Sequence, residues 1–317
     1  TLTPTQGINY LPGTESAESL VPDRDKSFVA FGNYADLKTI MTSGRFFPVM
    51  ISGMSGNGKT LSAMQVCAEL DRECIRANVT EETSEDDLLG GFRLIDGDTV
   101  WVNGPATIAM ERGAVLLLDE IDRGGERLLA LQPVLEGKPV FLKKIGRYVK
   151  PAPGFMVIAT ANTKGKGDDD GRYISANVQD DAMLERFPVT FIQESPSAAV
   201  EKKILRKFVV NAVHDISDDV SDFIDRLSVW SDVIRKTFME DGISEMITTR
   251  RLVRIVEAYF IFPDRLKVIK MMTNRFDDQT AASFLLLYRT VEDPDKTADK
   301  NPTNTDTENA TPEENAF

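Results

Sequence analysis

Five short apolar runs, each bounded by polar residues, glycine or proline, divide the first two thirds of the chain. They are FPVMISG (47–53), ECIRANV (73–79), GAVLLLDE (113–120), FMVIATAN (155–162) and FPVTFI (187–192). Such runs are typical of strands that are covered on both faces. The first run precedes LSAMQVCAEL (61–70), whose apolar residues recur at helical spacing. The alternation predicts an α/β domain over about 26–194, with a five-stranded, mostly parallel sheet.

Two segments of this domain have the pattern of β-hairpins. Residues 92–102, FRLIDGDTVWV, alternate apolar and polar positions around Asp96-Gly97, a favoured turn pair. Residues 138–150, KPVFLKKIGRYVK, are the second candidate and hold five basic and no acidic residues. Lysines on a hairpin are typical of a protected sheet edge, and they also suit contact with an acidic partner or a nucleic acid.

The pattern changes after Pro196, where apolar residues begin to recur at intervals of three and four. This spacing predicts helices near 197–213, 219–239, 248–262, 264–274 and 278–290. We therefore expect an all-helical second domain, a lid, over residues 195–291.

The two ends of the chain have compositions that do not favour a packed core. Residues 1–25 are rich in proline, glycine, serine and threonine, and residues 292–317 hold eight acidic residues against two lysines. We expect a loosely ordered N-terminal segment over 1–25 and a disordered acidic tail over 292–317, because neither can bury enough apolar surface to offset chain entropy.

The overall composition argues against several classes of protein. The 317 residues carry a net charge of −13, which disfavours a generally basic nucleic-acid-binding surface. The sequence has no apolar run of about 18 residues and no signal-peptide pattern, so we expect no membrane span and a cytoplasmic location. Cys67, Cys74 and the single histidine, His214, lack the spacing of a metal site or a disulfide framework.

The strongest chemical signal is GMSGNGKT, Gly53 to Thr60, between the first strand and the first helix. It matches G-x-x-x-x-G-K-[ST], a loop whose backbone N–H groups bind nucleotide phosphates together with the following helix N-terminus. In that pattern Lys59 contacts the β- and γ-phosphates, and the Thr60 hydroxyl is a ligand of Mg²⁺. The residues expected to contact ATP are Gly53, Ser55, Gly56, Asn57, Gly58, Lys59, Thr60 and Leu61.

Polar side chains end two of the central runs. Asp119 and Glu120 follow VLLL, and the carboxyl ends of parallel strands face the ligand crevice. Asp119 is expected to hold Mg²⁺, and Glu120 to polarise the attacking water. Asn162 ends the neighbouring run, where its amide can hydrogen-bond that water or simply form a turn. For Asp122 we expect a helix N-cap.

Two arginines lie near the ends of predicted elements. Arg186 precedes the fifth strand, and TTRRL (248–252) places Arg250 or Arg251 at the start of a lid helix. Arginine can neutralise charge on a transferring phosphoryl group, also when a neighbouring subunit supplies it. From spacing alone, an ordinary surface residue is the favoured interpretation at both positions.

This set of features resembles the AAA+ ATPases, and more narrowly their MoxR and magnesium/cobalt-chelatase branch. DEIDRG (119–124), LEGKP (135–139) and ATANTKGKGDDDGRY (159–173) are similar to segments of the CobS family, the ATPase subunits of aerobic cobaltochelatase. The resemblance implies a P-loop α/β core with a smaller helical lid, and hydrolysis of Mg-ATP.

The resemblance also implies roles for single residues. Asn162 takes the place of the sensor-1 residue, and Arg186 that of an arginine finger acting on the neighbouring subunit. Arg250 takes the place of the sensor-2 arginine, with Arg251 as the alternative. Both hairpins would face the ring pore or a partner. Asp168 to Asp170 lack the alternate spacing of a calcium loop, so we expect a solvated loop at a subunit interface.

For the whole protein, the resemblance implies a hexameric ring that remodels a partner protein. That partner would be a chelatase subunit or a von Willebrand A-type protein, as in cobalt insertion into a corrin. The alternatives are a MoxR-like chaperone with another protein client and, less favoured, a motor that acts on nucleic acid.

Overall fold

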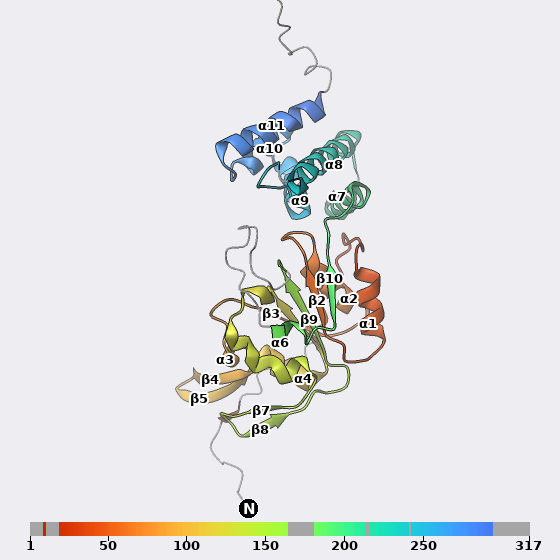
Figure 1. Cartoon of the computed structure of the whole chain (residues 1–317). Coiled ribbons are helices and arrows are strands. Elements are labelled where there is room, and N and C mark those ends of the chain that lie inside the picture. Colours follow the sequence, from red (N-terminus) through yellow and green to blue (C-terminus); the bar gives the residue numbers. More distant parts are fainter. Residues whose placement is uncertain (1–8, 11–18, 164–180, 214–215, 241, 294–317) are drawn as a thin grey trace, which may run out of the picture.

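A computed structural model describes residues 9–10, 19–163, 181–213, 216–240 and 242–293 (Figure 1). Its central sheet has five strands in the order β10-β2-β9-β6-β3, and every neighbouring pair is parallel. The predicted α/β fold and its five strands are confirmed, with a sheet that is entirely rather than mostly parallel. The strands are β2 (Val49–Ser52), β3 (Cys74–Asn78), β6 (Val115–Asp119), β9 (Met156–Ala161) and β10 (Val189–Ile192).

Helices cover both faces of this sheet. The two larger ones on the first face are α1 (Tyr34–Thr42) and α2 (Lys59–Glu69). On the opposite face lie α3 (Glu85–Leu88), α4 (Pro105–Arg112), the 3₁₀ turn Glu126–Leu131 and α5 (Gln132–Leu135). Only α2 among them was expected from the sequence, because the others are short or lack a long run of helical periodicity.

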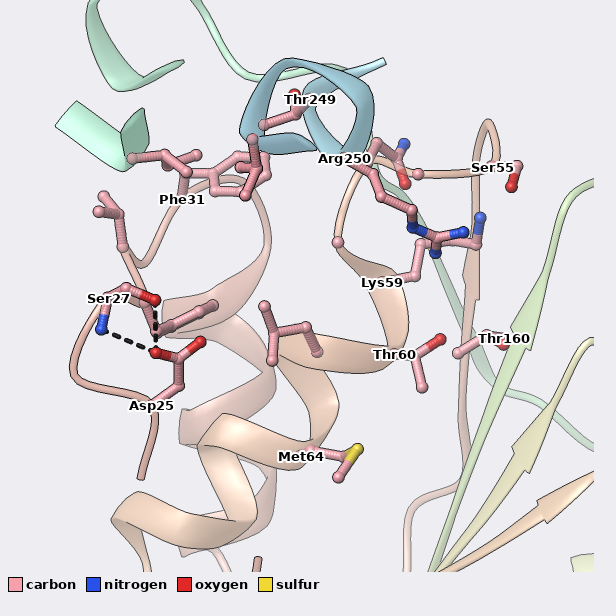
Figure 2. A pocket seen from close by; sticks show the side chains of 18 of the residues that line it. Asp25, Ser27, Phe31, Ser55, Lys59, Thr60, Met64, Thr160, Thr249 and Arg250 are labelled. Carbon is pink, nitrogen blue, oxygen red and sulfur yellow. Dashed lines mark hydrogen bonds between the residues drawn. The ribbon is translucent and has the colours of Figure 1, made fainter. Parts of the chain in front are cut away.

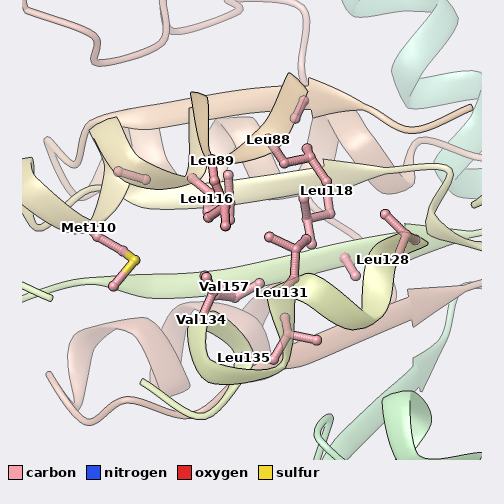
Figure 3. Packing of buried hydrophobic residues seen from close by; sticks show 14 of the residues in the cluster. Leu88, Leu89, Met110, Leu116, Leu118, Leu128, Leu131, Val134, Leu135 and Val157 are labelled. Atoms are coloured by element: carbon pink, nitrogen blue, oxygen red, sulfur yellow. The ribbon is translucent and has the colours of Figure 1, made fainter. Parts of the chain in front are cut away.

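The alternation of side chains along β6 decides which face each residue joins. Val115 and Leu117 pack with α1 and α2. Leu116 and Leu118 pack on the opposite face with α4, α5 and the 3₁₀ turn, as Figure 3 shows. Because residues i and i+2 of a strand share a face, Asp119 falls on the side of α2. This alternation brings the acidic strand end to the phosphate loop.

Both hairpins predicted from the sequence are present. The first joins β4 (Gly90–Ile95) to β5 (Asp98–Asn103), and the second joins β7 (Val140–Leu142) to β8 (Arg147–Val149). A two-residue strand, β1 (Asn9–Tyr10), pairs in parallel with β5. In Figure 1 the hairpins lie at the end of the α/β part that is farthest from the C-terminal helices.

The five predicted C-terminal helices are also present. They are α7 (Ala198–Val213), α8 (Asp218–Met239), α9 (Thr249–Ile261), α10 (Arg265–Thr273) and α11 (Asp278–Glu292). They share a core of their own around the buried side chains of Trp230, Phe223 and Tyr288. Within the described residues, no helix has both the length and the apolar character needed to cross a membrane. The domain boundaries given above stay predictions.

Candidate nucleotide site

The loop between β2 and α2 depends on glycine at several positions. Gly56 and Gly58 have φ angles of 81° and 87°, in the left-handed region that residues with a Cβ rarely adopt. Gly53 has a φ of 152°, and a Cβ there would lie 2.2 Å from the carbonyl oxygen of Gln193. The backbone therefore follows a path that the predicted glycines permit, and α2 begins directly after it at Lys59.

Lys59 lies inside this loop and is only 7% exposed. Its Nζ donates to the carbonyl oxygens of Gly53 at 2.6 Å and Met54 at 3.0 Å, and to Asn162 Oδ1 at 3.1 Å. One ammonium group thus links the phosphate loop to the end of β9.

Burial lowers the pKa of Lys59 from its ordinary value to about 8. The carboxylates of Asp122, Asp119 and Glu120 act in the opposite direction, and the positive charge of Arg250 adds to the lowering. Figure 2 shows the Arg250 guanidinium next to the Lys59 ammonium. Two cations brought this close form a site suited to a polyanion.

Asp119 ends β6 and is 3% exposed. Its Oδ1 accepts hydrogen bonds from Thr60 Oγ1, at 2.7 Å, and from Thr160, while Oδ2 pairs with Arg76. Burial by itself would raise the pKa of Asp119, but the hydrogen bonds from Thr160 and Thr60 and the charge of Arg76 outweigh it, so the pKa lies below its usual range. Asp119 is therefore a carboxylate at neutral pH.

Glu120 has φ 60° and ψ 45°, a left-handed conformation that is uncommon for a residue with a side chain. Its N–H donates to Thr160 Oγ1 at 3.0 Å, and its Oε2 pairs with Arg123 Nε at 3.1 Å. Backbone strain of this kind costs about 1–3 kcal/mol and is concentrated at functional sites. The turn separates the carboxylate of Glu120 from that of Asp119 although the two residues are adjacent.

The expectation that Asp122 caps a helix is wrong. Asp122 is inside a short 3₁₀ turn and is 1% exposed, and its Oδ2 accepts from the backbone N–H groups of Asn162 at 2.8 Å and Thr163 at 2.9 Å. The main chain leaving β9 presents two amide groups here, and the carboxylate binds both. Asp122 thereby fixes the backbone that carries Asn162.

The arginines occupy three different surroundings. Arg250 lines the pocket described below. Arg251 points into the lid, where its Nη1 donates to the carbonyl oxygen of Met272 at 2.7 Å and burial lowers its pKa. Arg186 pairs with Glu136, with Nη2 2.9 Å from Oε1. The geometry therefore favours Arg250 over Arg251 as the pocket residue.

These groups open onto a pocket of about 620 Å³ between the sheet and the lid (Figure 2). One part is polar and contains most of the predicted site residues. The other part is apolar, with side chains from the segment before α1, from α2 and from the lid. The predicted residues that line the pocket are Ser55, Gly56, Asn57, Gly58, Lys59, Thr60, Leu61, Asp119, Glu120, Asn162 and Arg250. The apolar ones include Phe31, Met64, Ile204, Phe208 and Val253.

The donor set fits Mg-ATP. An anionic triphosphate suits the polar part, and an aromatic base suits the apolar part. The Thr60 hydroxyl and the Asp119 carboxylate are hard oxygen ligands of the kind that Mg²⁺ prefers, and they already lie 2.7 Å apart. As defined by the described residues, the pocket is not lined by Gly53 or Arg186.

A comparison with protein families identifies this region. Residues 48–187 match the family model described as an AAA domain of the dynein-related subfamily. This range begins just before β2 and ends one residue after Arg186. Residues 48–187 are thus an AAA domain, and the chain is similar to AAA+ ATPases of the MoxR and chelatase branch. The match contains the phosphate loop and both polar strand ends that the pocket brings together.

Proteins similar to this chain include two that carry names. The aerobic cobaltochelatase subunit CobS of a Sinorhizobium species is 27% identical over 261 residues, which cover 80% of this chain and 77% of CobS. Protein NorQ of Paracoccus denitrificans (strain Pd 1222) is 32% identical over 117 residues, 36% of this chain and 43% of NorQ. A RuvB variant of Thermotoga maritima has a similar fold, with a TM-score of 0.50, 14% identity and coverage of 83% of this chain and 73% of that one.

Three side chains at the AAA+ site were missed by sequence reasoning. Thr160 contacts both acidic residues, Arg76 pairs with Asp119, and Thr248 lies against Gly56. Thr160 had a signal, because it is polar within an apolar strand and shares a face with Asn162 two residues later. Arg76 and Thr248 reach the site through the packing of β3 and the lid, which no local pattern encodes.

Proposed function

We propose that this AAA+ ATPase is a ring-forming, Mg-ATP-dependent motor that couples hydrolysis to the remodelling of a partner protein. One observation carries the proposal. Lys59, Asp119 and Glu120 converge in one pocket with Thr60, Asn162 and Arg250, the set needed to bind and hydrolyse a nucleoside triphosphate. Their individual roles stay proposals, and they follow from the contacts described above.

In hydrolysis, the oxygen of a water molecule bonds to the γ-phosphorus, and the bond from that phosphorus to the β–γ bridging oxygen breaks. Glu120 would accept the proton of the water, and the Asn162 amide would orient it. Lys59 and Arg250 would neutralise charge on the phosphate oxygens. Mg²⁺, held by Thr60 and Asp119, would supply further neutralisation of the β- and γ-phosphates. The products are ADP and inorganic phosphate.

A ring would explain the position of Arg186. This arginine does not line the described pocket of its own chain, and it pairs with Glu136 instead. An arginine that acts on a neighbouring subunit must lie outside its own site, and it requires a closed or helical assembly with head-to-tail contacts. We propose a hexamer of this kind.

For the client, we propose a protein rather than a nucleic acid. On the second hairpin, Lys144 pairs with Asp86 and Arg147 with Glu111, so part of its positive charge is neutralised within the chain. Phe141 and Tyr148 form an exposed aromatic pair with ring centroids 4.7 Å apart. Exposed aromatic side chains favour protein contacts. By similarity to CobS, the proposed partner is a chelatase subunit or a von Willebrand A-type protein.

ATP turnover by the purified protein tests the proposal. We expect Mg²⁺-dependent release of phosphate, and we expect Lys59→Ala to abolish binding of an ATP analogue. Turnover that rises with single- or double-stranded DNA would favour the nucleic-acid alternative.

Affinity purification from the source cells tests the proposed client. Recovery of a chelatase or von Willebrand A-type subunit would support it. Recovery of another protein client would favour the MoxR-like chaperone.

A further inference from the structure

A buried carboxylate in the lid has no place in the reaction described so far. Glu201 of α7 is 0% exposed, and it forms an ion pair with Arg235 of α8, whose Nη2 lies 2.6 Å from Oε1. Ser231, also on α8, donates from its hydroxyl to Oε2 at 2.8 Å. A buried ion pair often adds little to stability compared with apolar residues of the same volume. The Glu201–Arg235 pair is therefore better explained by another group whose position it fixes than by its contribution to stability.

Both partners of the pair also hold the start of α9. The Thr249 hydroxyl, on the first residue of α9, donates to Glu201 Oε1 at 2.7 Å. Arg235 Nε donates to the carbonyl oxygen of Ile247 at 2.9 Å. The ion pair therefore fixes the residues on either side of Thr248, which is the N-cap of α9. Three helices, α7, α8 and α9, meet at one carboxylate.

The turn fixed in this way is the part of the lid that faces the phosphate loop. Thr248 lies so close to Gly56 that a Cβ on that glycine would be 2.9 Å from Thr248 Oγ1. Arg250, one residue after Thr249, lines the pocket beside Lys59. The direction of Arg250 thus depends on the backbone that Glu201 and Arg235 hold.

We propose that Glu201, with Arg235, is a positioning residue for Arg250: it acts through the Thr249 hydroxyl to set where the Arg250 guanidinium lies against the nucleotide phosphates. This inference rests on the proposed function for the role of Arg250.

The chain offers a matched pair of substitutions. Thr249→Val keeps the shape of the side chain and removes the hydroxyl that reaches Glu201 from α9. Ser231→Ala removes a hydroxyl that reaches the same carboxylate from α8, which carries no pocket residue among those described. Both variants leave a buried carboxylate with one donor fewer, so they should lose similar stability in urea unfolding. Thr249→Ser retains the hydroxyl and serves as the rescue variant.

The experiment measures the affinity of a non-hydrolysable ATP analogue with Mg²⁺, and the kcat of ATP hydrolysis, in a double-mutant cycle with Arg250→Ala. We expect Thr249→Val to weaken binding and lower kcat about tenfold in the wild-type background, and to have little effect once Arg250 is absent. Ser231→Ala should stay within about twofold of wild type, and Thr249→Ser should restore function.

Two results would overturn the inference. One is equal loss from Thr249→Val and Ser231→Ala, which would reveal a role in stability alone. The other is an effect of Thr249→Val that is just as large in the Arg250→Ala background. A wild-type protein that binds the analogue without turnover would contradict the proposed function instead, and the binding cycle would still decide the role of Glu201.

Discussion

At the scale of single residues, the Thr160 hydroxyl connects the two carboxylates at the end of β6. It donates to Asp119 and accepts from the Glu120 N–H. The hydroxyl therefore supports the left-handed turn at Glu120 and holds the Asp119 carboxylate. One small side chain sets the separation between the proposed magnesium ligand and the proposed base.

Thr160→Val should test this arrangement, since valine has the same shape and no hydroxyl. The Glu120 N–H loses its acceptor, which costs about 1–3 kcal/mol when the group is buried. We expect kcat to fall at least about tenfold, with a smaller change in nucleotide affinity. Thr160→Ser should retain most activity. Steady-state phosphate release across a range of ATP concentrations separates the two parameters, and an unchanged kcat in Thr160→Val would refute the role.

At the scale of elements, the phosphate loop and the start of α9 form a direct contact between the two parts of the molecule. Gly56→Ala should disturb it, because the new Cβ would meet Thr248 and also strain a φ of 81°. Gly44→Ala is the control, with a φ of 66° and no atom within 4 Å of the added Cβ. We expect both variants to lose stability, about 1 kcal/mol for the backbone alone. Only Gly56→Ala should weaken ATP binding, as titration with a fluorescent analogue would reveal; equal affinities would contradict the contact.

A second element-scale prediction concerns the edge strand β3. Glu73, the residue before this strand, forms an ion pair with Arg112, the last residue of α4. The Arg112 hydrogen bond holds the pKa of Glu73 below its usual value of about 4.3. A lowered folded pKa contributes stability above the unfolded pKa, and this stability is lost as pH falls through the folded pKa. Urea unfolding at pH 7, 5 and 3 should therefore show a gap between wild type and Glu73→Gln that closes toward pH 3. A gap independent of pH would contradict this origin.

At the scale of the whole molecule, the site lies between two parts that are separate in sequence. The strands, both hairpins, the lid helices and the phosphate loop could be predicted, because each depends on a local pattern of apolar residues or glycines. The hydrogen-bond partners of Asp122 could not be predicted, because its carboxylate accepts from backbone amides at the end of β9, 40 residues later in the chain. The choice between Arg250 and Arg251 likewise depends on how α9 packs. The prediction of a solvated loop at Asp168 to Asp170 concerns residues outside the described ranges, and so does the predicted acidic tail beyond residue 293.

The ring itself can be tested by mixing inactive subunits. Arg186→Ala keeps an intact pocket, and Glu120→Gln keeps an intact arginine. If Arg186 acts on the neighbouring subunit, a 1:1 mixture should recover about a quarter of wild-type turnover, because half of the pockets are intact and half of those face an intact Arg186. Each variant alone should be nearly inactive. No recovery on mixing would argue against an arginine supplied in trans.

The most direct test of the central claim is ATP binding and turnover by Glu120→Gln. The amide preserves the size of the side chain but cannot accept the proton of the attacking water, and general-base catalysis contributes about 10²–10⁴-fold. We predict that this variant binds ATP as tightly as wild type and that its turnover falls at least about 100-fold. Turnover equal to that of the wild-type protein would contradict the account of this pocket as an ATP-hydrolysing site.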